Sequence, residues 1–455
     1  MKLSSMLNRH WLLCYMLFFV LSAKPLLLSA QNEGEPLSLA EAIAWGVDNN
    51  LDVAGQLLNV EVATRNDNWV SAGRAPVVQA TLGLNNARNS QDNPASFING
   101  SFYNGNVSAG ISANYTLFNG YRVRYVKRQL GQNVQLANQQ LKQLIEGSVF
   151  EVASAYYTAQ LEQARVEVNK KVFKLNQDRV AYQELRKEYG QGQSVELLQA
   201  KTALLSDSIR IEQSRVTYDN ALRALYTALD AKPETFAGRD LADSLVFEAR
   251  DWDIAQIERR IDSSAAIQLL KTQEQLALTN TEIARTAMKP SITLNGGLNF
   301  TETAFKLSGD DPRTGDPAEL VFGNTSGASL GVNAAYTLWD AGARKRNIDN
   351  AIVQERVANI SVRNAKQDAN MQARSLLATY RNQRKLLSLQ DLLIETARAN
   401  LNLSEEQLRA GTINSFDYRA VQLEYVNAEL NRLQTVYNLL LSDLNLRRIS
   451  ATLLK

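Results

Sequence analysis

The sequence is almost free of cysteine and histidine. Its one cysteine and one histidine, Cys14 and His10, both lie at the N-terminus. The N-terminus has the pattern of a secretory signal peptide. It begins with basic residues, continues with an apolar run from Trp11 to Leu21, and ends with small residues at a cleavage site near Ala30. The run is shorter than the ~20 residues that a membrane-spanning helix needs, which disfavours an N-terminal anchor. Residues preceding Cys14 lack the small side chains that lipid attachment requires. We therefore expect residues 1–30 to be removed.

A mature chain beginning at residue 31 has neither cysteine nor histidine, which excludes disulfides, thiolate metal sites and imidazole ligands or bases. Carboxylate-only and Ser-Lys catalysis remain possible, but no cluster of reactive residues appears. We therefore expect no enzyme, no cofactor and no bound metal. The mature chain keeps 46 basic and 47 acidic residues. A general nucleic-acid-binding protein would carry a basic surplus, so nucleic acid is not an expected partner.

Proline and glycine are missing from long stretches. No proline occurs from residue 95 to 232, and no glycine occurs between Gly342 and Gly411. Roughly 65 residues without a helix breaker, at 1.5 Å rise per residue, would make a helix of ~100 Å. Ordinary globular helices have about 12 residues. The sequence therefore predicts very long helices in a special architecture.

Two sets of residues recur at a fixed offset of 221 positions. The segment from Tyr115 to Asn119 returns from Tyr336 to Asp340, and Gly190, Ser194 and Glu196 return as Gly411, Ser415 and Asp417. An internal repeat has to be recognised before a fold is assigned. We expect residues 31–455 to form a single domain made of two structural repeats, at about 38–232 and 252–450.

The long helical stretches also show the three-four spacing of paired helices. In the second copy this seam is Leu423, Val426, Leu430, Leu433, Tyr437, Leu440 and Leu444. In the first copy it is Leu197, Ala200, Leu204, Asp207, Ile211, Ser214 and Tyr218. A charge such as Asp207 is costly in a dry seam unless it is paired. A bundle core explains the apolar seam, whereas mixed small and polar members also suit a ring of helices around a wet lumen.

Four segments alternate apolar residues with small or polar ones, as β-strands do. They span residues 78–85, 107–117, 292–300 and 328–338, and none contains a charge. Each has about the length of a strand that crosses an outer membrane obliquely. Aromatic residues lie at strand ends, where a membrane interface would be: Tyr115, Phe118, Tyr336 and Trp339. A soluble sandwich also alternates, but its wet face usually carries charges.

Four strands cannot close a membrane barrel, because lipid tolerates no open edge and about eight strands is the practical minimum. Several copies must share one barrel: two would supply eight strands and three would supply twelve, and the pattern leaves this choice open. The expected fold class is a mixed α and β membrane protein, mostly α, with four antiparallel strands per chain. Its long helices would continue the barrel as a helical tube in the periplasm. The alternative is a soluble periplasmic coiled-coil scaffold in which the strands form a capping sheet.

The chain resembles TolC-type outer-membrane efflux proteins over residues 37–450. The matching features are the opening Leu37–Ile43 with Asn49 and Asn50, the strand exits Leu117–Gly120 and Leu338–Gly342, and two hairpin glycines each followed six residues later by an acid. The resemblance implies a homotrimer in outer-membrane lipid, with a shared twelve-stranded β-barrel and a periplasmic coiled-coil barrel. It also implies a periplasmic adaptor and an inner-membrane transporter as partners, and passive conduction of small molecules.

The resemblance also assigns roles to the two helix turns. Asp417 and Glu196 become candidates for the periplasmic aperture, with Arg419 close enough to neutralise Asp417 in part. The adaptor-docking candidates at the hairpin tips are Gly190, Ser194, Gly411 and Ser415. Ser194 and Ser415 are also placed as helix N-caps, and an acid two residues later would favour the positive helix terminus. The family's second acid and its tip-locking tyrosine and arginine fall on Ala420, Leu408 and Ile413.

Overall fold

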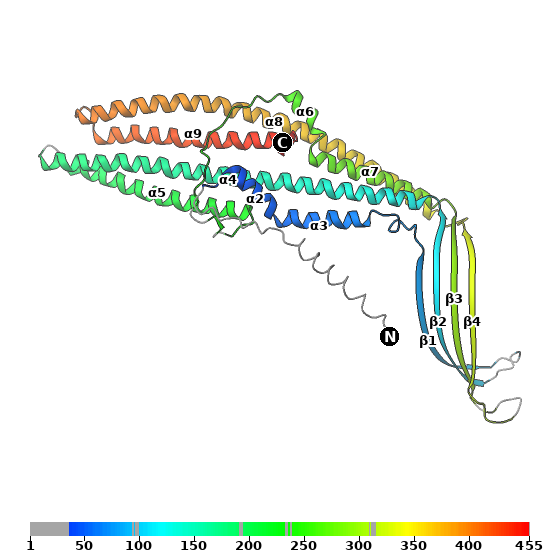
Figure 1. Cartoon of the computed structure of the whole chain (residues 1–455). Helices are drawn as coiled ribbons and strands as arrows, with labels where there is room; N and C mark the ends of the chain where they lie inside the picture. The colour runs from blue at the N-terminus through cyan, green and yellow to red at the C-terminus, as the bar shows by residue number, and fades with distance from the viewer. Residues whose placement is uncertain are drawn as a thin grey trace, which may run out of the picture. The chain divides into compact units, whose positions relative to one another are not determined.

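The computed structural model describes residues 36–92, 95, 100–190, 194–232, 235–236, 239–308, 310 and 315–454. The predicted signal peptide at 1–30 lies outside the described residues. The elements, in chain order, are α2 Leu39–Asn49, α3 Leu51–Asn66, β1 Val77–Gln91, β2 Gly100–Asn119, α4 Arg122–Glu188, α5 Ser194–Ala228, α6 Ile254–Ile261, α7 Ala265–Thr286, β3 Ser291–Leu307, β4 Val321–Ala335, α8 Ala343–Arg409 and α9 Ser415–Ile449 (Figure 1). The expectation of a mostly helical chain with four antiparallel strands is confirmed.

The chain divides into two compact units. Unit 1 contains the described residues up to Trp45 together with Ala155–Val246, and unit 2 contains Gly46–Ser154 together with Phe247–Lys455. The division falls inside α4, so it cuts the first predicted repeat rather than separating the two repeats. The boundary between the two sequence repeats therefore does not coincide with the boundary between the two compact units.

The long helices of the two repeats have matching lengths. Helices α4 and α8 contain 67 residues each, and α5 and α9 contain 35 each. Both pairs keep the offset of 221 residues that the sequence shows. Stretches without proline allow helices of this length because no residue removes a backbone N–H from the ladder. Within the described ranges, no helix is both long and apolar enough to cross a membrane.

The four strands of unit 2 form one antiparallel sheet in the order β1-β2-β3-β4 (Figure 1). They contain 15, 20, 17 and 15 residues, so each is longer than the sequence pattern predicted. In β1, β2 and β4 the added segments are rich in asparagine, serine and glycine, whose alternation is too weak to detect in a sequence. The segments added to β1 and β3 carry charges, at Arg88, Glu302 and Lys306. Tyr336 and Trp339 lie beyond the end of β4 at Ala335.

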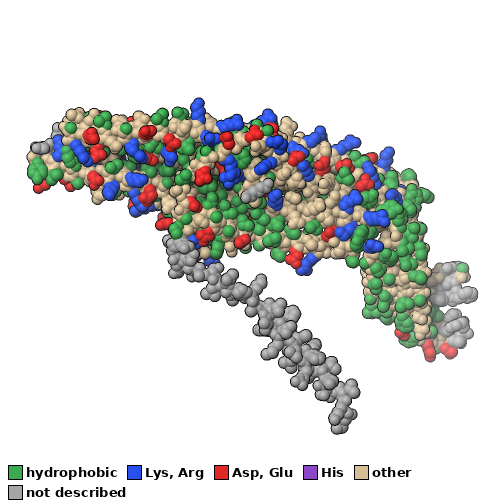
Figure 2. Space-filling view, turned by 45° about the horizontal axis from the view of Figure 1, so that its top comes forward, with side chains coloured by type: hydrophobic (Ala, Val, Ile, Leu, Met, Phe, Trp, Pro, Cys, Tyr) green, Lys and Arg blue, Asp and Glu red, His purple; other side chains and the backbone are tan. Residues whose placement is uncertain are grey.

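The register gives this sheet two different faces. Residues paired across the strands point to the same face. One row reads Ala80, Ile111, Leu298 and Ala328, and the next reads Leu82, Ala109, Phe300 and Ser326. The rows that alternate with these read Gln79, Ser112, Gly297 and Ser329, and then Thr81, Gly110, Asn299 and Gly327. One face is therefore mainly apolar and the other small and polar, and hydrophobic side chains gather over the strands while charged ones gather over the helices (Figure 2).

The helices of unit 2 share an apolar core. Its buried members come from α6, α7, α8 and α9: Ile257, Ile261, Ile267, Ala373, Leu377, Tyr380, Leu439 and Leu446. Complete burial of one such aliphatic side chain contributes about 1.5–3 kcal/mol. The Tyr380 hydroxyl is satisfied because it donates to the carbonyl oxygen of Arg250 at 2.6 Å. This core fixes α6, α7, α8 and α9 as one body.

Unit 1 is held by a different set of contacts. The Tyr156 hydroxyl on α4 donates to the carbonyl oxygen of Leu37 at 2.7 Å and also lies 2.8 Å from the carboxylate of Asp243. Burial raises the pKa of Tyr156, and the hydrogen bond to Asp243 raises it further. Trp45 and Phe236 pack edge to face with ring centroids 5.3 Å apart. One buried tyrosine thus connects the start of the described chain to the segment after α5.

The two predicted helical seams have different outcomes. The mixed seam of the first copy is correct, since Leu197, Ala200, Asp207 and Ile211 are all buried on α5. The apolar seam of the second copy is only partly correct, because just Val426 and Leu444 of its members are buried on α9. Helix α9 instead buries Val436, Leu439 and Leu446. A straight helix drifts by about 20° per heptad against a strict seven-residue repeat, so a heptad drawn along the sequence leaves the contact face.

Candidate functional site: two helix-hairpin tips

Glycine makes both hairpin turns possible. Gly190 after α4 and Gly411 after α8 have φ values of 72° and 76°. At Gly411 the N–H donates to Leu408 and the next N–H, of Thr412, donates to Gln407. This pair of bonds is the Schellman motif, in which a glycine in the left-handed region closes a helix. A side chain at either glycine would meet open space, so the backbone conformation, not crowding, requires glycine there.

The N-cap of α9 is Asn414, which corrects the prediction for Ser415. The Asn414 side-chain oxygen accepts from the N–H groups of Phe416 and Asp417, both at 2.9 Å. Asparagine and serine cap helices about equally well, so the sequence alone does not choose between neighbours. Ser415 is the first residue of the helix and is fully buried. It is therefore not accessible to an adaptor in this structure, whereas Ser194, the first residue of α5, is exposed.

Asp417 lies in the first turn of α9 with an exposed side chain. No ion pair to this carboxylate occurs among the described residues. The nearby Arg419 donates instead to the side-chain oxygen of Gln422, one turn further along α9, at 2.6 Å. That Arg419 partly neutralises Asp417 stays a prediction. In this hairpin the exposed carboxylate keeps its charge available for water or ions.

Glu196, the matching acid of the first copy, has a different environment. Its carboxylate lies 3.6 Å from the guanidinium of Arg186 on α4, and the two side chains are 22% and 28% exposed. Arg186 also lies over the ring of Tyr182. Glu196 therefore forms an ion pair across its own hairpin and is only half-exposed. Two acids in equivalent sequence positions occupy unlike sites.

A buried polar seam joins α4 to α5, and the sequence revealed only one side of it. Asn176 donates from its amide to the carboxylate of Asp207, and both side chains are buried. Further along the same seam Asn169 donates to the hydroxyl of Ser214 at 2.6 Å. Arg179 and Gln183 are also buried on α4. The three-four spacing of Asn169, Asn176, Arg179, Gln183 and Arg186 was the available signal, but it consists of polar residues and so does not resemble a core pattern.

The other hairpin is closed by apolar contacts near its tip. Leu401, Leu408 and Tyr418 form a buried cluster against which Ile413, Val421 and Tyr425 pack. Leu408 and Ile413, which stand where the resembling family has a latch of tyrosine and arginine, are therefore packing residues. A polar group lies beside this cluster, because the Tyr425 hydroxyl donates to Glu429 at 2.7 Å. Arg398 on α8 contacts the same carboxylate at 3.2 Å.

Both tips expose large apolar side chains that the sequence analysis did not select. Tyr189 is 73% exposed beside Gly190, and Phe416 is 71% exposed beside Asp417. Val195, in the position equivalent to Phe416, is 61% exposed. Exposed aromatic and aliphatic side chains at a chain turn are candidates for contact with another protein. They are better placed for docking than the buried Ser415.

The fold is shared with solved outer-membrane channels. The Campylobacter jejuni CmeC outer membrane channel matches with a TM-score of 0.75, at 17% identity over 91% of this chain and 86% of that one. The Neisseria gonorrhoeae MtrE outer membrane channel, solved in its open state, matches with a TM-score of 0.70, at 17% identity over 92% of this chain and 89% of that one.

Sequence comparison points in the same direction. The chain is 24% identical over 421 residues to the probable efflux pump outer membrane protein TtgC of Pseudomonas putida, covering 90% of this chain and 82% of that protein. A model of the outer membrane efflux protein family matches twice, at residues 47–231 and 257–452. The two matches correspond to the two halves of the internal duplication. The chain belongs to the outer membrane efflux protein family, and it is an outer-membrane channel component of an efflux system, not an enzyme.

Proposed function

We propose that three copies of this chain assemble into one duct through which small molecules pass without catalysis. The sheet carries this proposal, because β1 and β4 each pair with a single neighbour in the described chain. An unpaired strand edge is not tolerated in lipid, so β4 of one copy must pair with β1 of the next. The apolar face would then meet lipid and the polar face would line the lumen.

The number of copies follows from what the duct has to do. Two copies would give eight strands, and side chains fill the interior of a barrel of about that size. Three copies give twelve strands and leave room for a water-filled passage. The polar face supports this, because its glycine, serine, threonine and asparagine side chains are too short to fill a wide lumen. The helices would extend the passage into the periplasm.

Cross-linking of the two edge strands tests the assembly. Gln79→Cys on β1 and Ser329→Cys on β4 place thiols on the polar face, and the mature chain has no other cysteine. A short bis-maleimide reagent, which does not span the three strand spacings of about 14 Å between the two residues within one chain, should join copies in outer membranes and give covalent dimers and trimers but no larger species. The readout is the mass of the denatured products on a gel.

A matched pair inside one chain provides the control. Gln79→Cys with Ser112→Cys joins two residues that pair directly between β1 and β2. This variant should react to the same extent and remain at monomer mass. Products limited to dimers, or a ladder that extends beyond trimers, would contradict the three-copy duct. Monomers alone from the edge pair would contradict a shared barrel altogether.

We also propose that the hairpin tips bind a periplasmic adaptor, which connects the duct to an inner-membrane transporter. Tyr189, Val195 and Phe416 supply the exposed apolar contacts that support this role. Phe416→Ser should reduce co-purification of the adaptor and the export of its cargo, while the assembly in detergent stays intact. Leu58→Ser is the matched control, since Leu58 is 63% exposed on α3 and far from either tip in the chain. Equal loss in both variants would contradict docking at the tips.

A further inference from the structure

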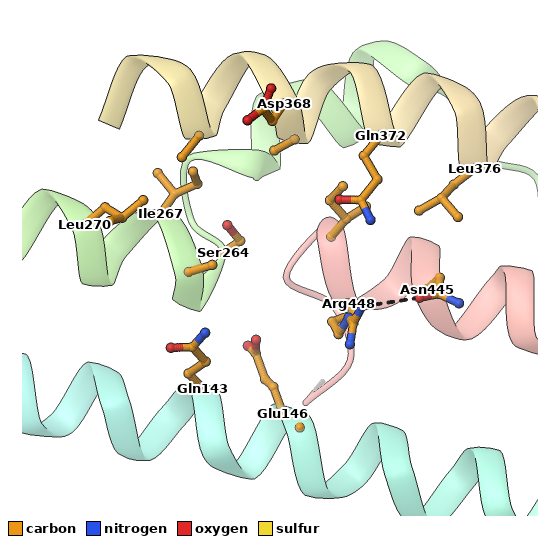
Figure 3. A pocket seen from close by; sticks show the side chains of 15 residues that line it. Gln143, Glu146, Ser264, Ile267, Leu270, Asp368, Gln372, Leu376, Asn445 and Arg448 are labelled. Atoms are coloured by element: carbon orange, nitrogen blue, oxygen red, sulfur yellow. Dashed lines mark hydrogen bonds between the residues drawn. The ribbon is translucent and has the colours of Figure 1, made fainter. Parts of the chain in front are cut away.

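A cavity of about 580 Å³ lies within unit 2, between helices α4, α7, α8 and α9 (Figure 3). Small-molecule sites have volumes of about 300–1,000 Å³ and mostly apolar walls with a few convergent polar groups. The apolar wall here contains Ile267, Leu270, Leu376 and Ile449. The polar groups come from the other sides of the cavity: Gln143 and Glu146 from α4, Asp368 and Gln372 from α8, and Asn445 and Arg448 from α9. The cavity thus has the size and composition of a binding site for an organic molecule.

Glu146 is the unusual member of this set. Its side chain points into the cavity (Figure 3), and the residue is only 6% exposed. No hydrogen bond or ion pair to its carboxylate is found among the described residues. Other buried acids of this chain are satisfied: Asp443 accepts from Trp252 at 2.8 Å and pairs with Arg447 at 2.7 Å. The carboxylate is held away from bulk water, which makes its charge costly, and the nearby Lys142 and Arg448 offset that cost only in part. A cationic ligand in the cavity would lower it further.

The nearest cations are occupied elsewhere or lie outside the cavity. The Arg448 guanidinium lies over the ring of Phe150 at 4.4 Å and donates to Asn445 at 3.4 Å. Lys142, one turn before Glu146 on α4, does not line the cavity. Asp368 adds a second carboxylate from α8, and α7 contributes no charged group to the lining. Two acids against one arginine leave the lining with a net negative charge.

We propose that this cavity binds an organic cation with an apolar body, whose N–H groups donate to Glu146. The positive charge would offset the buried carboxylate, and a hydrogen bond to an ionised group is about twice as strong as one between neutral groups. The apolar body would contact the wall formed by α7 and α8. Gln143, Gln372 and Asn445 offer amide groups that orient the molecule. Such a site goes beyond conduction, because it requires equilibrium binding at one place in the helical part.

Ethidium is a suitable probe, since it is a flat aromatic monocation with two amino groups. We expect saturable binding to the purified, detergent-solubilised assembly, followed by fluorescence anisotropy at neutral pH. Glu146→Gln keeps the shape and removes the charge, and should weaken binding at least tenfold. Leu376→Trp fills the cavity, keeps Glu146 and should also abolish binding. Glu151→Gln is the matched control, because Glu151 is an exposed glutamate on the same helix, and it should bind as the unmodified chain does.

A second measurement distinguishes a ligand site from a structural ion pair. Burial raises the pKa of Glu146, and the charges of Lys142 and Arg448 lower it only in part. A folded-state pKa above the unfolded value of 4.5 means that the carboxyl favours folding when protonated and loses that contribution as pH rises. Glu146→Gln should therefore raise the Tm of the ligand-free protein at neutral pH, and this gain should vanish at pH values below the unfolded pKa.

Each alternative result contradicts the site. If the unmodified chain binds no ethidium, the cavity is closed in the assembly, for example by a neighbouring copy. If Glu146→Gln binds equally well, the carboxylate does not recognise the cation. If Glu151→Gln loses binding too, the effect is one of general charge. A lower Tm for Glu146→Gln would show that Glu146 is a structural ion pair. None of these outcomes depends on the number of copies in the duct, which the cross-linking tests separately.

Discussion

The two long hairpins have equal helix lengths, but different chemistry holds them together. Between α4 and α5 the contacts are polar: Asn176 donates to Asp207, Asn169 to Ser214, and Arg186 pairs with Glu196. Between α8 and α9 the tip is closed by Leu401, Leu408 and Tyr418. Each hairpin also has the other kind of contact: Val180, Leu197 and Ala200 form an apolar cluster in α4–α5, and Arg432 pairs with Asp391 in α8–α9. The two copies of one sequence pattern therefore reached the same geometry with a different balance of polar and apolar contacts.

Polar and apolar contacts between two helices differ in how strongly they fix the helix register and in how much they stabilise the pair. Apolar side chains gain free energy from many alternative contacts, so a seam of leucines tolerates a shift by one heptad. A polar pair such as Asn176 with Asp207 forms its hydrogen bond in one register only, and a shift would separate the donor from this acceptor. We therefore expect the α4–α5 hairpin to be the more uniquely aligned and the α8–α9 hairpin to gain more from its packing.

Tyr418→Ala should weaken the α8–α9 tip most. Tyr418 is 4% exposed in the cluster with Leu401 and Leu408, and replacing a buried aromatic residue by alanine costs about 3–5 kcal/mol. Hydrogen exchange of peptides from this tip should show a local opening free energy lower by about that amount, with no change in α4–α5. Phe416→Ala is the control, since Phe416 is exposed in the same turn. Equal effects from both variants would mean that the cluster does not hold the tip.

Asp207→Ala should destabilise the α4–α5 hairpin by about 2 kcal/mol, because the buried Asn176 amide loses its carboxylate acceptor and keeps only the long hydrogen bond to the Val172 carbonyl oxygen at 3.4 Å. Replacing both partners, Asn176→Leu with Asp207→Leu, should recover most of that loss, since two apolar side chains need no hydrogen bond. Hydrogen exchange of α5 peptides measures both. If the double variant is as unstable as the single one, the seam contributes stability and the contrast with the other hairpin is wrong.

The sequence predicted the repeating architecture well and its contacts poorly, for physical reasons. The absence of proline predicted the long helices, and the alternation of apolar with small or polar residues predicted the four strands. Both features depend on local backbone chemistry. The partner of Asp207 could not be found, since no sequence feature says which face of α4 meets α5. Asn414 was missed as the N-cap because the neighbouring Ser415 is an equally good capping residue type. The cavity around Glu146 brings side chains of α4 together with side chains of α7, α8 and α9, which lie far from α4 in the chain, and no local pattern predicts this contact.

Asn414→Ala should cost about 1 kcal/mol, the typical value for removing an N-cap. Its side-chain oxygen accepts two N–H groups at the start of α9, and both would lose their partner. Exchange of the first turn of α9 should become faster while the rest of the helix is unchanged. Ser194→Ala provides the comparison at the start of α5, where the exposed serine is a helical residue and should have little effect. A larger effect from Ser194→Ala would restore serine as the cap.

The smallest effect on stability, and the most informative one for transport, is expected at the two acids. Asp417 is exposed without an ion pair in the described chain, whereas Glu196 already faces Arg186 at 3.6 Å. Three copies of Asp417 around a threefold axis would bring three uncompensated carboxylates together, and such a ring attracts cations most strongly where water is excluded. Asp417→Asn should therefore lower cation selectivity and weaken block by multivalent cations in planar-bilayer recordings, with assembly unchanged.

Glu196→Gln is the matched variant for this test. Glu196 is only 22% exposed and faces Arg186 across its own hairpin, so passing ions should contact it less than Asp417, and Glu196→Gln should change selectivity less. If Asp417 only stabilises the positive N-terminus of α9, Asp417→Asn should not change selectivity, because the carboxylate then does not contact ions in the lumen. If Glu196→Gln alters selectivity and Asp417→Asn does not, the first hairpin lines the constriction. If neither variant alters it, both acids serve their own helices and the narrowest point is formed by other residues.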